Sequence, residues 1–550
     1  MKGLSSRLLR AGVAVGAALV VFKLAGLVQS IVVGHYLPKA AGDVYVFAFE
    51  NCIFALFLLG DGIIGPALMP IFMRDAASGP EGERRAWRNA SAFLTWQFII
   101  LAAMAALLAA FPEFFVRLLT SWTPTTHPDK FALAASTVRR LSPALLGLSL
   151  GSTTYTLLNA QKRFFVAALG DAAWKCTAIA ALLVFARGSA DPAGVLVAGL
   201  VAGSVAKFVL HLSGLGSNVR RLRPTLRFER GFPRAFAALA WPLLFGAAFA
   251  LLRDNLNNVY FPSLLTDGIM QANSWGSKLE KVLVVLIPTT LSIAAFPFLC
   301  EMAADKGSLA SFVSKTARQL VALFLPLAAF VAAAAVPMTS LLFQGGAFDA
   351  VSVRRTALSM ALYTFALPAV AVETILMKAF FASRRTLAVS LLGIAFSSLS
   401  VVMTWAGSRA FAGREMAVLA VIAGGFAISR WLKTATLSAL FFHGAKRTDE
   451  AQATSCGDGV ASRCGPIRTA FFIFRVSIAS AAVAAATHFA VAVAAPRTAA
   501  MAPKVGALCS LAAAAVTAFA ALAATFAALR ITEPVDLARS VIRNRRRTGD

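Results

Sequence analysis

The sequence predicts an all-α polytopic membrane protein, and three observations support this fold class. Of its 550 residues, 59% are hydrophobic and only 14% are charged, whereas a soluble domain is about 45–50% apolar and about 25% charged. Apolar runs of membrane length recur from one end of the chain to the other, with no long polar block between them. The basic residues gather in the short loops that connect these runs.

The apolar runs predict about fourteen transmembrane helices. Several runs are longer than the roughly 20 residues that a bilayer requires, which implies tilt, kinks or helical extensions. The predicted spans are 10–35, 43–73, 88–112, 132–160, 163–187, 192–214, 235–262, 266–303, 309–343, 352–383, 386–407, 414–445, 468–495 and 502–530.

Loop charge predicts the topology. Most Lys and Arg residues follow the even-numbered helices or lie at the termini, whereas the alternate loops carry few, such as Lys39, Lys130 and Arg187. Cytoplasmic loops are enriched in Lys and Arg, so we expect both termini in the cytoplasm. The net charge of +27 then indicates contact with anionic phospholipid rather than with nucleic acid. The apolar run behind Lys2, Arg7 and Arg10 is interpreted as a retained first helix.

The domain organisation follows from the most basic loop, 216–234, which falls after the sixth helix. A faint repeat supports two parallel six-helix lobes, since Pro70 and Pro297 are each followed by Ala-Ala and then Gly near a helix end. The last two helices are either a lipid-facing pair or a groove for a lipid tail. The predicted parts are an N-lobe 1–215, a linker 216–234, a C-lobe 235–445, a cytoplasmic loop 446–467, two helices 468–530 and a basic tail 531–550.

Charges inside the apolar runs are costly and mark candidate functional residues. Some have a structural interpretation: Asp171 and Lys175 are spaced to pair on one helix, and Lys207 and Arg430 are interpreted as snorkelling to the cytoplasmic face. Glu373 and Lys378 complete the less specific part of the set, whereas Asp254 and Glu280 lie beside the cavity candidates Arg253 and Lys281.

Six charges fall in the opening helices of the two predicted lobes, where they predict a substrate cavity. Lysine and arginine there suit an anionic headgroup, and the acidic members either pair with them or bind a coupling cation. The six are Lys23, Glu50, Asp61, Arg253, Lys278 and Lys281. Asp43 opens the second helix just past an outward loop, which predicts a position at the outer mouth of this cavity. Gly60, Gly62, Pro66 and Pro70 cluster beside Asp61 and predict a hinge.

The five histidines form no HxxxH or HExxH pair, and the six cysteines fit no zinc spacing. We therefore expect no metal and no cofactor, with a coupling ion or the membrane potential as the remaining sources of drive. We also expect a monomer.

Five segments resemble the MurJ/MviN family, the lipid II flippases of the MOP superfamily. Leu342-Phe-Gln-Gly-Gly-Ala-Phe348 is similar to the family's L-F-x-x-G-x-F and is the most specific match. The others are Asp43-Val-Tyr-Val-Phe-Ala-Phe49, Gly60-Asp-Gly-Ile-Ile-Gly-Pro-Ala-Leu-Met-Pro70, Leu158-Asn-Ala-Gln-Lys-Arg-Phe164 and Ser274-Trp-Gly-Ser-Lys-Leu279. The resemblance implies the family's fold, and it implies flipping of an undecaprenyl-pyrophosphate-linked saccharide such as the peptidoglycan precursor lipid II.

The chain departs from the family pattern at charged positions. In the first helix, Lys23 keeps one family charge, but Gln29 and Ser30 stand where the family has Arg and Asp. Phe54-Ala-Leu-Phe57 replaces a family Arg pair, and Ser277-Lys278 replaces Asp-Arg. Arg253 and Lys281 are candidates for compensation.

Three other functions stay open. One is export of another lipid-linked oligosaccharide or a small cation by a MOP transporter, and another is a non-transporting scaffold derived from a flippase. A polyprenyl-phosphate glycosyltransferase is disfavoured, because such enzymes carry acidic motifs in a large outward loop and the outward loops here are short. We therefore expect a transporter rather than an enzyme.

Overall fold

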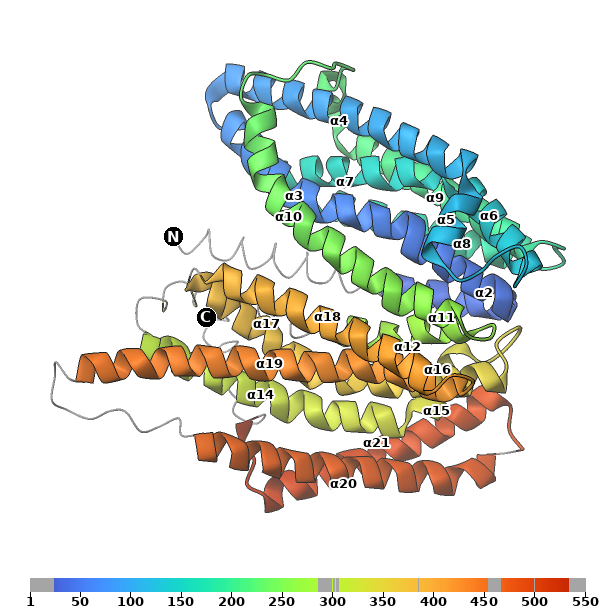
Figure 1. Cartoon of the computed structure of the whole chain (residues 1–550), viewed down its shortest axis with the longest axis vertical. Helices are drawn as coiled ribbons and strands as arrows, with labels where there is room; N and C mark the ends of the chain where they lie inside the picture. Colours follow the sequence, from blue (N-terminus) through green and yellow to red (C-terminus); the bar gives the residue numbers. More distant parts are fainter. Residues whose placement is uncertain are drawn as a thin grey trace, which may run out of the picture. The chain divides into compact units, whose positions relative to one another are not determined.

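The structure is a computed structural model that describes residues 24–284, 299, 302, 306–383, 385–453, 466–498 and 500–533. These residues form helices joined by turns (Figure 1), with one isolated bridge between Gly345 and Phe348. The all-helical fold class is confirmed. Lys23, Pro297 and the predicted basic tail beyond Glu533 lie outside the described residues.

The chain divides into two compact units. The first comprises Met1–Ser274 with Gly345–Phe348, and the second comprises Trp275–Gln344 with Asp349–Asp550. The division falls inside one helix, so the helices of the predicted C-lobe that precede it pack with the first unit. The division into two six-helix lobes related by pseudo-symmetry, with the boundary at 216–234, stays a prediction.

The first unit is a bundle of helices in which two segments take the wider π-helical turn. An apolar helix covers Leu24–Tyr36. The elements that follow are α2 (Lys39–Tyr45), the π-helix η1 (Val46–Ile53), α3 (Phe54–Ala76), α4 (Gly79–Ala110), α5 (Pro112–Leu119), α6 (Pro128–Leu141), α7 (Ala144–Ala160), α8 (Phe164–Phe185), α9 (Pro192–Gly214), the 3₁₀-helix η2 (Gly216–Arg221), α10 (Phe232–Asn255), the π-helix η3 (Leu256–Tyr260), α11 (Phe261–Ser263) and the start of α12 (Ile269–Val284).

The second unit packs long helices around a core that includes Phe324, Leu376 and Leu437. The final pair, α20 and α21, packs mutually and against α14 and α15. The elements of the second unit are the rest of α12, α14 (Lys306–Ala333), α15 (Ala335–Phe343), α16 (Ala350–Phe365), α17 (Leu367–Ala382), α18 (Thr386–Ala410), α19 (Glu415–Ala453), α20 (Pro466–Thr498) and α21 (Pro503–Ala528).

Helix ends follow from local chemistry. α9 begins after Asp191, whose carboxylate accepts a hydrogen bond from the Gly194 N–H at 2.8 Å, and Pro192 occupies the first helical position, where no N–H is needed. In the same way, Asp349 caps α16 through the N–H of Ser352 at 2.9 Å. A proline in the run 132–160 divides it into α6 and α7, because Pro143 lacks the N–H that would continue the first helix.

Ten helices among the described residues are long and apolar enough to cross a membrane, or eleven if the bent pair Phe232–Trp241 and Leu243–Ser263 is one span. The predicted number of about fourteen is larger for two reasons. It counts predicted spans that the structure divides into shorter helices, and it counts spans that include residues outside the described ranges. α5 was not predicted. It is short and exposes Phe114 and Leu118, so it does not have the length of a span.

Small residues allow α7, α8 and α9 to approach closely. A Cβ on Gly203 of α9 would stand 2.5 Å from the Trp174 carbonyl oxygen of α8, and a Cβ on Gly147 of α7 would stand 2.5 Å from the Ser204 carbonyl carbon of α9. Membrane helices gain van der Waals contact at such crossings, since lipid supplies no hydrophobic drive between helices.

We expect Gly203→Ala to destabilise the protein by about 1–3 kcal/mol, because the added methyl group meets backbone that cannot turn aside. The matched control is Gly246→Ala in α10, where a Cβ would meet nothing within 4 Å, and which should leave stability unchanged or raised. Thermal unfolding of the detergent-solubilised protein measures both. Equal stability of the two variants would contradict the close crossing of α8 and α9.

Candidate functional site

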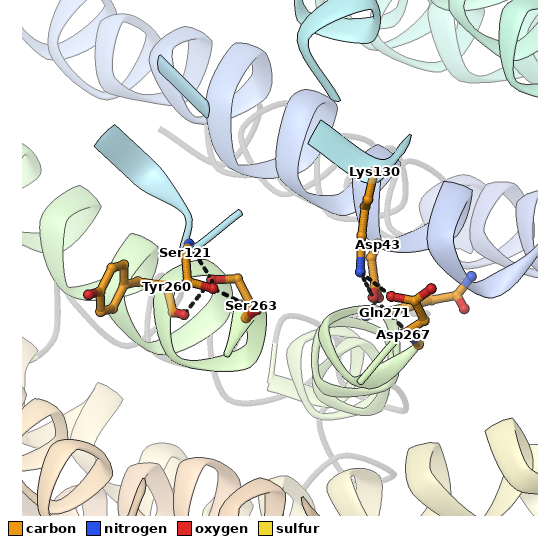
Figure 2. Close-up of polar contacts among 8 residues, drawn as sticks. Asp43, Ser121, Lys130, Tyr260, Ser263, Asp267 and Gln271 are labelled. Atoms are coloured by element: carbon orange, nitrogen blue, oxygen red, sulfur yellow. Dashed lines mark hydrogen bonds and ion pairs between the residues drawn. The ribbon is translucent and has the colours of Figure 1, made fainter. Parts of the chain in front are cut away.

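A buried polar cluster of the first unit surrounds Asp43, the acidic residue of α2 (Figure 2). Its side chain is 1% exposed. One carboxylate oxygen accepts the N–H of Gly268 at 2.8 Å, and the other accepts the N–H of Gln271 at 2.8 Å. Asp43 therefore caps the N-terminus of α12 from a distant helix and satisfies two of its free N–H groups.

The chain is shaped locally for this contact. Gly268 has φ +88, a conformation that glycine adopts without strain, and it turns the backbone into α12. Gly42, beside Asp43, leaves room for the Gln271 side chain, because a Cβ there would stand 2.3 Å from the Gln271 Nε2 atom.

Lys130 of α6 supplies the positive charge of the cluster. Its Nζ atom lies 2.8 Å from Asp43 and 2.7 Å from Asp267, and its side chain is only 7% exposed. The ammonium also lies 4.5 Å from the centroid of the Trp122 ring, where the aromatic face attracts a cation. A buried charge with this many partners is satisfied, so Lys130 joins α6, α2 and the α11–α12 turn.

A second contact joins the α5–α6 connection to α11 (Figure 2). Ser121 donates its hydroxyl to the carbonyl of Ser263 at 2.7 Å, and the Ser121 N–H donates to the Ser263 hydroxyl at 2.8 Å. The two hydroxyl oxygens are 2.9 Å apart. This paired contact and the Asp43 cluster link α2, α5 and α6 to the turn that leads into α12.

The predicted cavity residues of the first unit each have a polar contact. Glu50 lies in η1 and accepts the Ser274 hydroxyl at 2.6 Å. Asp61 lies in α3 and accepts the Ser152 hydroxyl at 2.7 Å. Arg253 pairs with its neighbour Asp254 at 2.6 Å. Their shared role in a cavity stays a prediction.

Two predicted lysines belong to the second unit. Lys278 is half-buried, with its ammonium 5.8 Å from the centroid of the Trp275 ring. Lys281, one turn later in α12, is exposed. Lys23, the remaining predicted cavity residue, lies outside the described residues.

The predicted hinge residues lie within one continuous helix. α3 runs from Phe54 to Ala76 with Pro66 and Pro70 inside it, and Gly60 and Gly62 have no close neighbour that requires glycine. The backbone irregularity lies earlier, in η1. Such π-helical segments occur often at functional sites. Bending at the four hinge residues during function stays a prediction.

Two structural interpretations of single charges are wrong. Asp171 pairs with Lys207 of the neighbouring α9, at 2.6 Å, rather than with Lys175. Lys207 is 1% exposed and therefore does not snorkel. The Arg430 side chain is 22% exposed and pairs with the buried Glu373 at 3.2 Å, so its charge has a partner on another helix of the second unit. In each case a partner on another helix lowers the cost of burial, and spacing along one helix cannot show such a partner.

Sequence reasoning missed two residues. Loop charge alone assigns Lys130 to an outward loop. Its position two residues after Pro128 places it in the first turn of α6. Lys433 pairs with Glu373 at 2.6 Å, with both side chains buried. Its spacing of three from Arg430 in an apolar run is the signal that could have revealed it, since residues three apart share a helix face.

Neutral groups stand where family charges were expected. Gln29 is buried and donates to the Tyr45 hydroxyl at 3.1 Å, and Ser30 donates to the Gly26 carbonyl at 3.0 Å. Phe54 and Phe57 pack together, and the Lys207 ammonium lies 4.6 Å from the Phe57 ring centroid. Lys207 of α9 thus places a cation beside Phe57, which lies in the segment where the resemblance predicts an arginine pair.

The helices of membrane length and the charge clusters buried between them define a polytopic membrane protein. The solved inward-facing structure of a MATE family multidrug transporter of the MOP superfamily has a similar fold, with a TM-score of 0.63 at 13% identity, covering 78% of this chain and 96% of that chain. The solved lipid II flippase MurJ in an inward closed conformation gives a TM-score of 0.70 at 15% identity, covering 94% of this chain and 99% of that chain.

The family model of lipid II flippase MurJ matches residues 38–457, so the chain belongs to this family. Two curated relatives agree. The probable lipid II flippase MurJ of Bdellovibrio bacteriovorus is 26% identical over 383 residues, which cover 66% of this chain and 70% of that protein. The lipid II flippase MurJ of Burkholderia cenocepacia is 25% identical over 357 residues, covering 62% and 67% respectively. The predicted family and transporter class are confirmed.

We expect Lys130→Met to destabilise the protein by about 3–5 kcal/mol, because it leaves the buried Asp43 carboxylate without its cation. Arg140→Met is the matched control, since Arg140 pairs with Asp191 at 3.4 Å with both side chains more than half exposed, and its loss should cost about 1 kcal/mol or less.

The double variant Asp43→Asn/Lys130→Met completes a thermodynamic cycle, measured by chemical or thermal unfolding. It should lose less stability than the sum of the two single variants, because residues in one network are not additive. Strict additivity would show that the Asp43–Lys130 pair does not stabilise the fold.

Proposed function

We propose that this protein flips lipid II, an undecaprenyl-pyrophosphate-linked saccharide, from the inner to the outer leaflet of the bacterial inner membrane. The observation that carries the proposal is the family match over residues 38–457. The buried cations of the chain support it, because a pyrophosphate can cross the membrane only where fixed positive charge replaces its water. The product would serve peptidoglycan synthesis and cell shape.

The substrate cavity is proposed around Lys23, Glu50, Asp61, Arg253, Lys278 and Lys281. Lys278 and Lys281 lie on one helix and are half-buried and exposed respectively, which suits a cation that must bind and then release an anionic headgroup. The contact of Arg253 with Asp254 leaves it partly neutralised. Hydrated lysines release cargo more readily than a dry ion-pair cage, since no full desolvation cost is involved.

Asp43 is proposed to lie at the outer mouth, where the Asp43 cluster and the Ser121–Ser263 contact hold the outward side closed. Alternating access requires the outward side to open after the headgroup has entered from the cytoplasm. Hydrogen bonds from the Gly268 and Gln271 N–H groups to Asp43 can be exchanged for water when the mouth opens. Asp61 would lie near the cytoplasmic side, about 27 Å further along the helix at about 1.5 Å per residue.

Both termini are proposed to be cytoplasmic, as the loop charges indicate. The ion pairs Arg221–Glu83 and Arg88–Glu229 tie the basic linker to the start of α4, so two basic segments that are both predicted to be cytoplasmic lie together. The remaining arginines would meet anionic phospholipid headgroups.

A related cargo is the second candidate, because Gln29 and Tyr45 form a neutral pair where the resemblance predicts charge. Another undecaprenyl-linked oligosaccharide with a different headgroup would then be the substrate. Vesicles that contain labelled lipid II, compared with vesicles that contain another labelled undecaprenyl-pyrophosphate glycan, distinguish the two.

We expect Lys23→Ala and Lys278→Ala each to abolish flipping of labelled lipid II in vesicles while leaving expression and folding intact. Each variant removes a cation that compensates the pyrophosphate. Arg253→Ala should have a smaller effect because Asp254 already neutralises part of that charge. Lys504→Ala, at an exposed lysine of α21, is the control. Wild-type rates in both Lys23→Ala and Lys278→Ala would favour the scaffold interpretation.

We expect the double variant Ser121→Cys/Ser263→Cys to stop flipping when oxidised, in a chain whose six native cysteines are replaced by serine. The two hydroxyl oxygens are 2.9 Å apart, so the thiols that replace them lie within reach of a disulfide that would hold the outward side closed. Reduction should restore transport, and Ser121→Cys alone should be insensitive to oxidant. Full transport by the cross-linked protein would show that this contact need not open.

A further inference from the structure

Two polar side chains of α9 pack against glycine residues of the neighbouring helices α7 and α8. Lys207 and His211 lie one turn apart on α9, and both side chains are at most 1% exposed. A Cβ on Gly151 of α7 would stand 2.7 Å from the Lys207 Cε atom, and a Cβ on Gly170 of α8 would stand 2.0 Å from the His211 Nε2 atom. The packing of three helices therefore fixes the imidazole in position.

Both nitrogens of His211 face backbone carbonyl oxygens. Nδ1 lies 3.0 Å from the Gly151 oxygen, and Nε2 lies 3.0 Å from the Ala167 oxygen. A neutral imidazole has one N–H and one lone pair, so it can donate to only one of these oxygens. An imidazolium, which carries a proton on each nitrogen, donates to both.

Thr154 provides for the neutral form. Its hydroxyl oxygen lies 3.2 Å from Nδ1, and it also lies 3.0 Å from the Gly151 carbonyl of its own helix. When His211 is neutral, the Thr154 hydroxyl donates to the Nδ1 lone pair. When Nδ1 is protonated, the hydroxyl turns to the Gly151 carbonyl instead. The site therefore has a hydrogen-bond arrangement for each protonation state.

Charges around His211 act in opposite directions. The Lys207 ammonium, one turn away on the same helix, repels an imidazolium, whereas the carboxylate of Asp171 on α8, which pairs with Lys207 at 2.6 Å, attracts it. The helix dipole of α9 also favours a cation in the last turn, which contains His211. Tyr155 of α7 lies beside the ring, with centroids 6.1 Å apart.

The remaining neighbours lie further away. Lys175 of α8 packs beside Gly26 and Trp174. Arg163 donates to the Gly214 carbonyl at the end of α9, and Arg221 of η2 pairs with Glu83. α6 contributes Arg140, which meets Asp191 at the opposite end of α9.

Asp61 of α3 accepts the Ser152 hydroxyl of α7 at 2.7 Å and is a further carboxylate among the charged groups around Lys207.

We propose that His211 is a reversible proton-binding site in the interior of the first unit. The proton comes from water and adds to the lone pair of Nδ1, and the Thr154 hydroxyl turns away as it binds. Asp171, whose side chain is 23% exposed, is the least buried charged group of the Lys207–Asp171 pair and is proposed as the entry point for the proton. Binding of a proton is a property of the folded unit and does not depend on the cargo proposed above.

The test follows ¹⁵N-histidine signals of the full chain in detergent micelles or nanodiscs. His211→Gln identifies the His211 signal by its loss. Between about pH 5 and pH 8, where histidine changes charge, the two His211 nitrogens should change from one protonated and one bare nitrogen to two protonated nitrogens. A His211 signal that keeps either pattern throughout this range would overturn the proposal.

Two variants test the proposed hydrogen-bond arrangement through the direction in which each shifts the midpoint of the His211 titration. Thr154→Val removes the donor to the neutral form, so the midpoint of the His211 titration should rise by about one pH unit. Asp171→Asn removes the favourable negative charge, so the midpoint should fall. His443→Gln, at an exposed histidine of α19, should leave the midpoint unchanged. A midpoint that does not move in Thr154→Val, or that falls, would overturn the proposed role of the hydroxyl.

Discussion

A charge buried between membrane helices must be balanced by a partner nearby, because lipid offers no water to take its place. The described helices meet this constraint in a consistent way, with partners that come from different helices. Lys130 of α6 meets Asp43 of α2, Lys207 of α9 meets Asp171 of α8, and Lys433 of α19 meets Glu373 of α17. Each pair lowers the cost of its own charges and at the same time fixes the position of two helices.

Close helix packing also shapes the polar interior of the first unit. Gly151 and Gly170 leave room for Lys207 and His211, and Gly42 leaves room for Gln271 beside Asp43. The small residues therefore serve two purposes, since they gain backbone contact and they admit polar groups that carry charge or hydrogen bonds into the interior.

The chain keeps the flippase fold while changing the chemistry of its interior. Gln29 stands where the family resemblance predicts an arginine and forms a neutral hydrogen bond with Tyr45, and Phe54 and Phe57 form an aromatic contact where it predicts an arginine pair. A cation returns from elsewhere, because the Lys207 ammonium lies against the Phe57 ring. A helical scaffold tolerates such exchanges when the replacement groups satisfy one another locally.

The sequence by itself determined the fold class, the approximate positions of most helices and the family, because apolar run length, loop charge and short motifs are local properties of the chain. Asp43 could be selected from sequence because it opens a helix next to an outward loop. Its role as the cap of α12 could not, since Gly268 and Gln271 are more than two hundred residues away in the sequence. Asp171 and Lys207 were misinterpreted for the same reason: spacing along one helix shows which residues share a face but not which residues lie opposite. The tertiary structure alone decided the partners of the buried charges, because those partners are fixed by helix crossings that glycines on other helices permit.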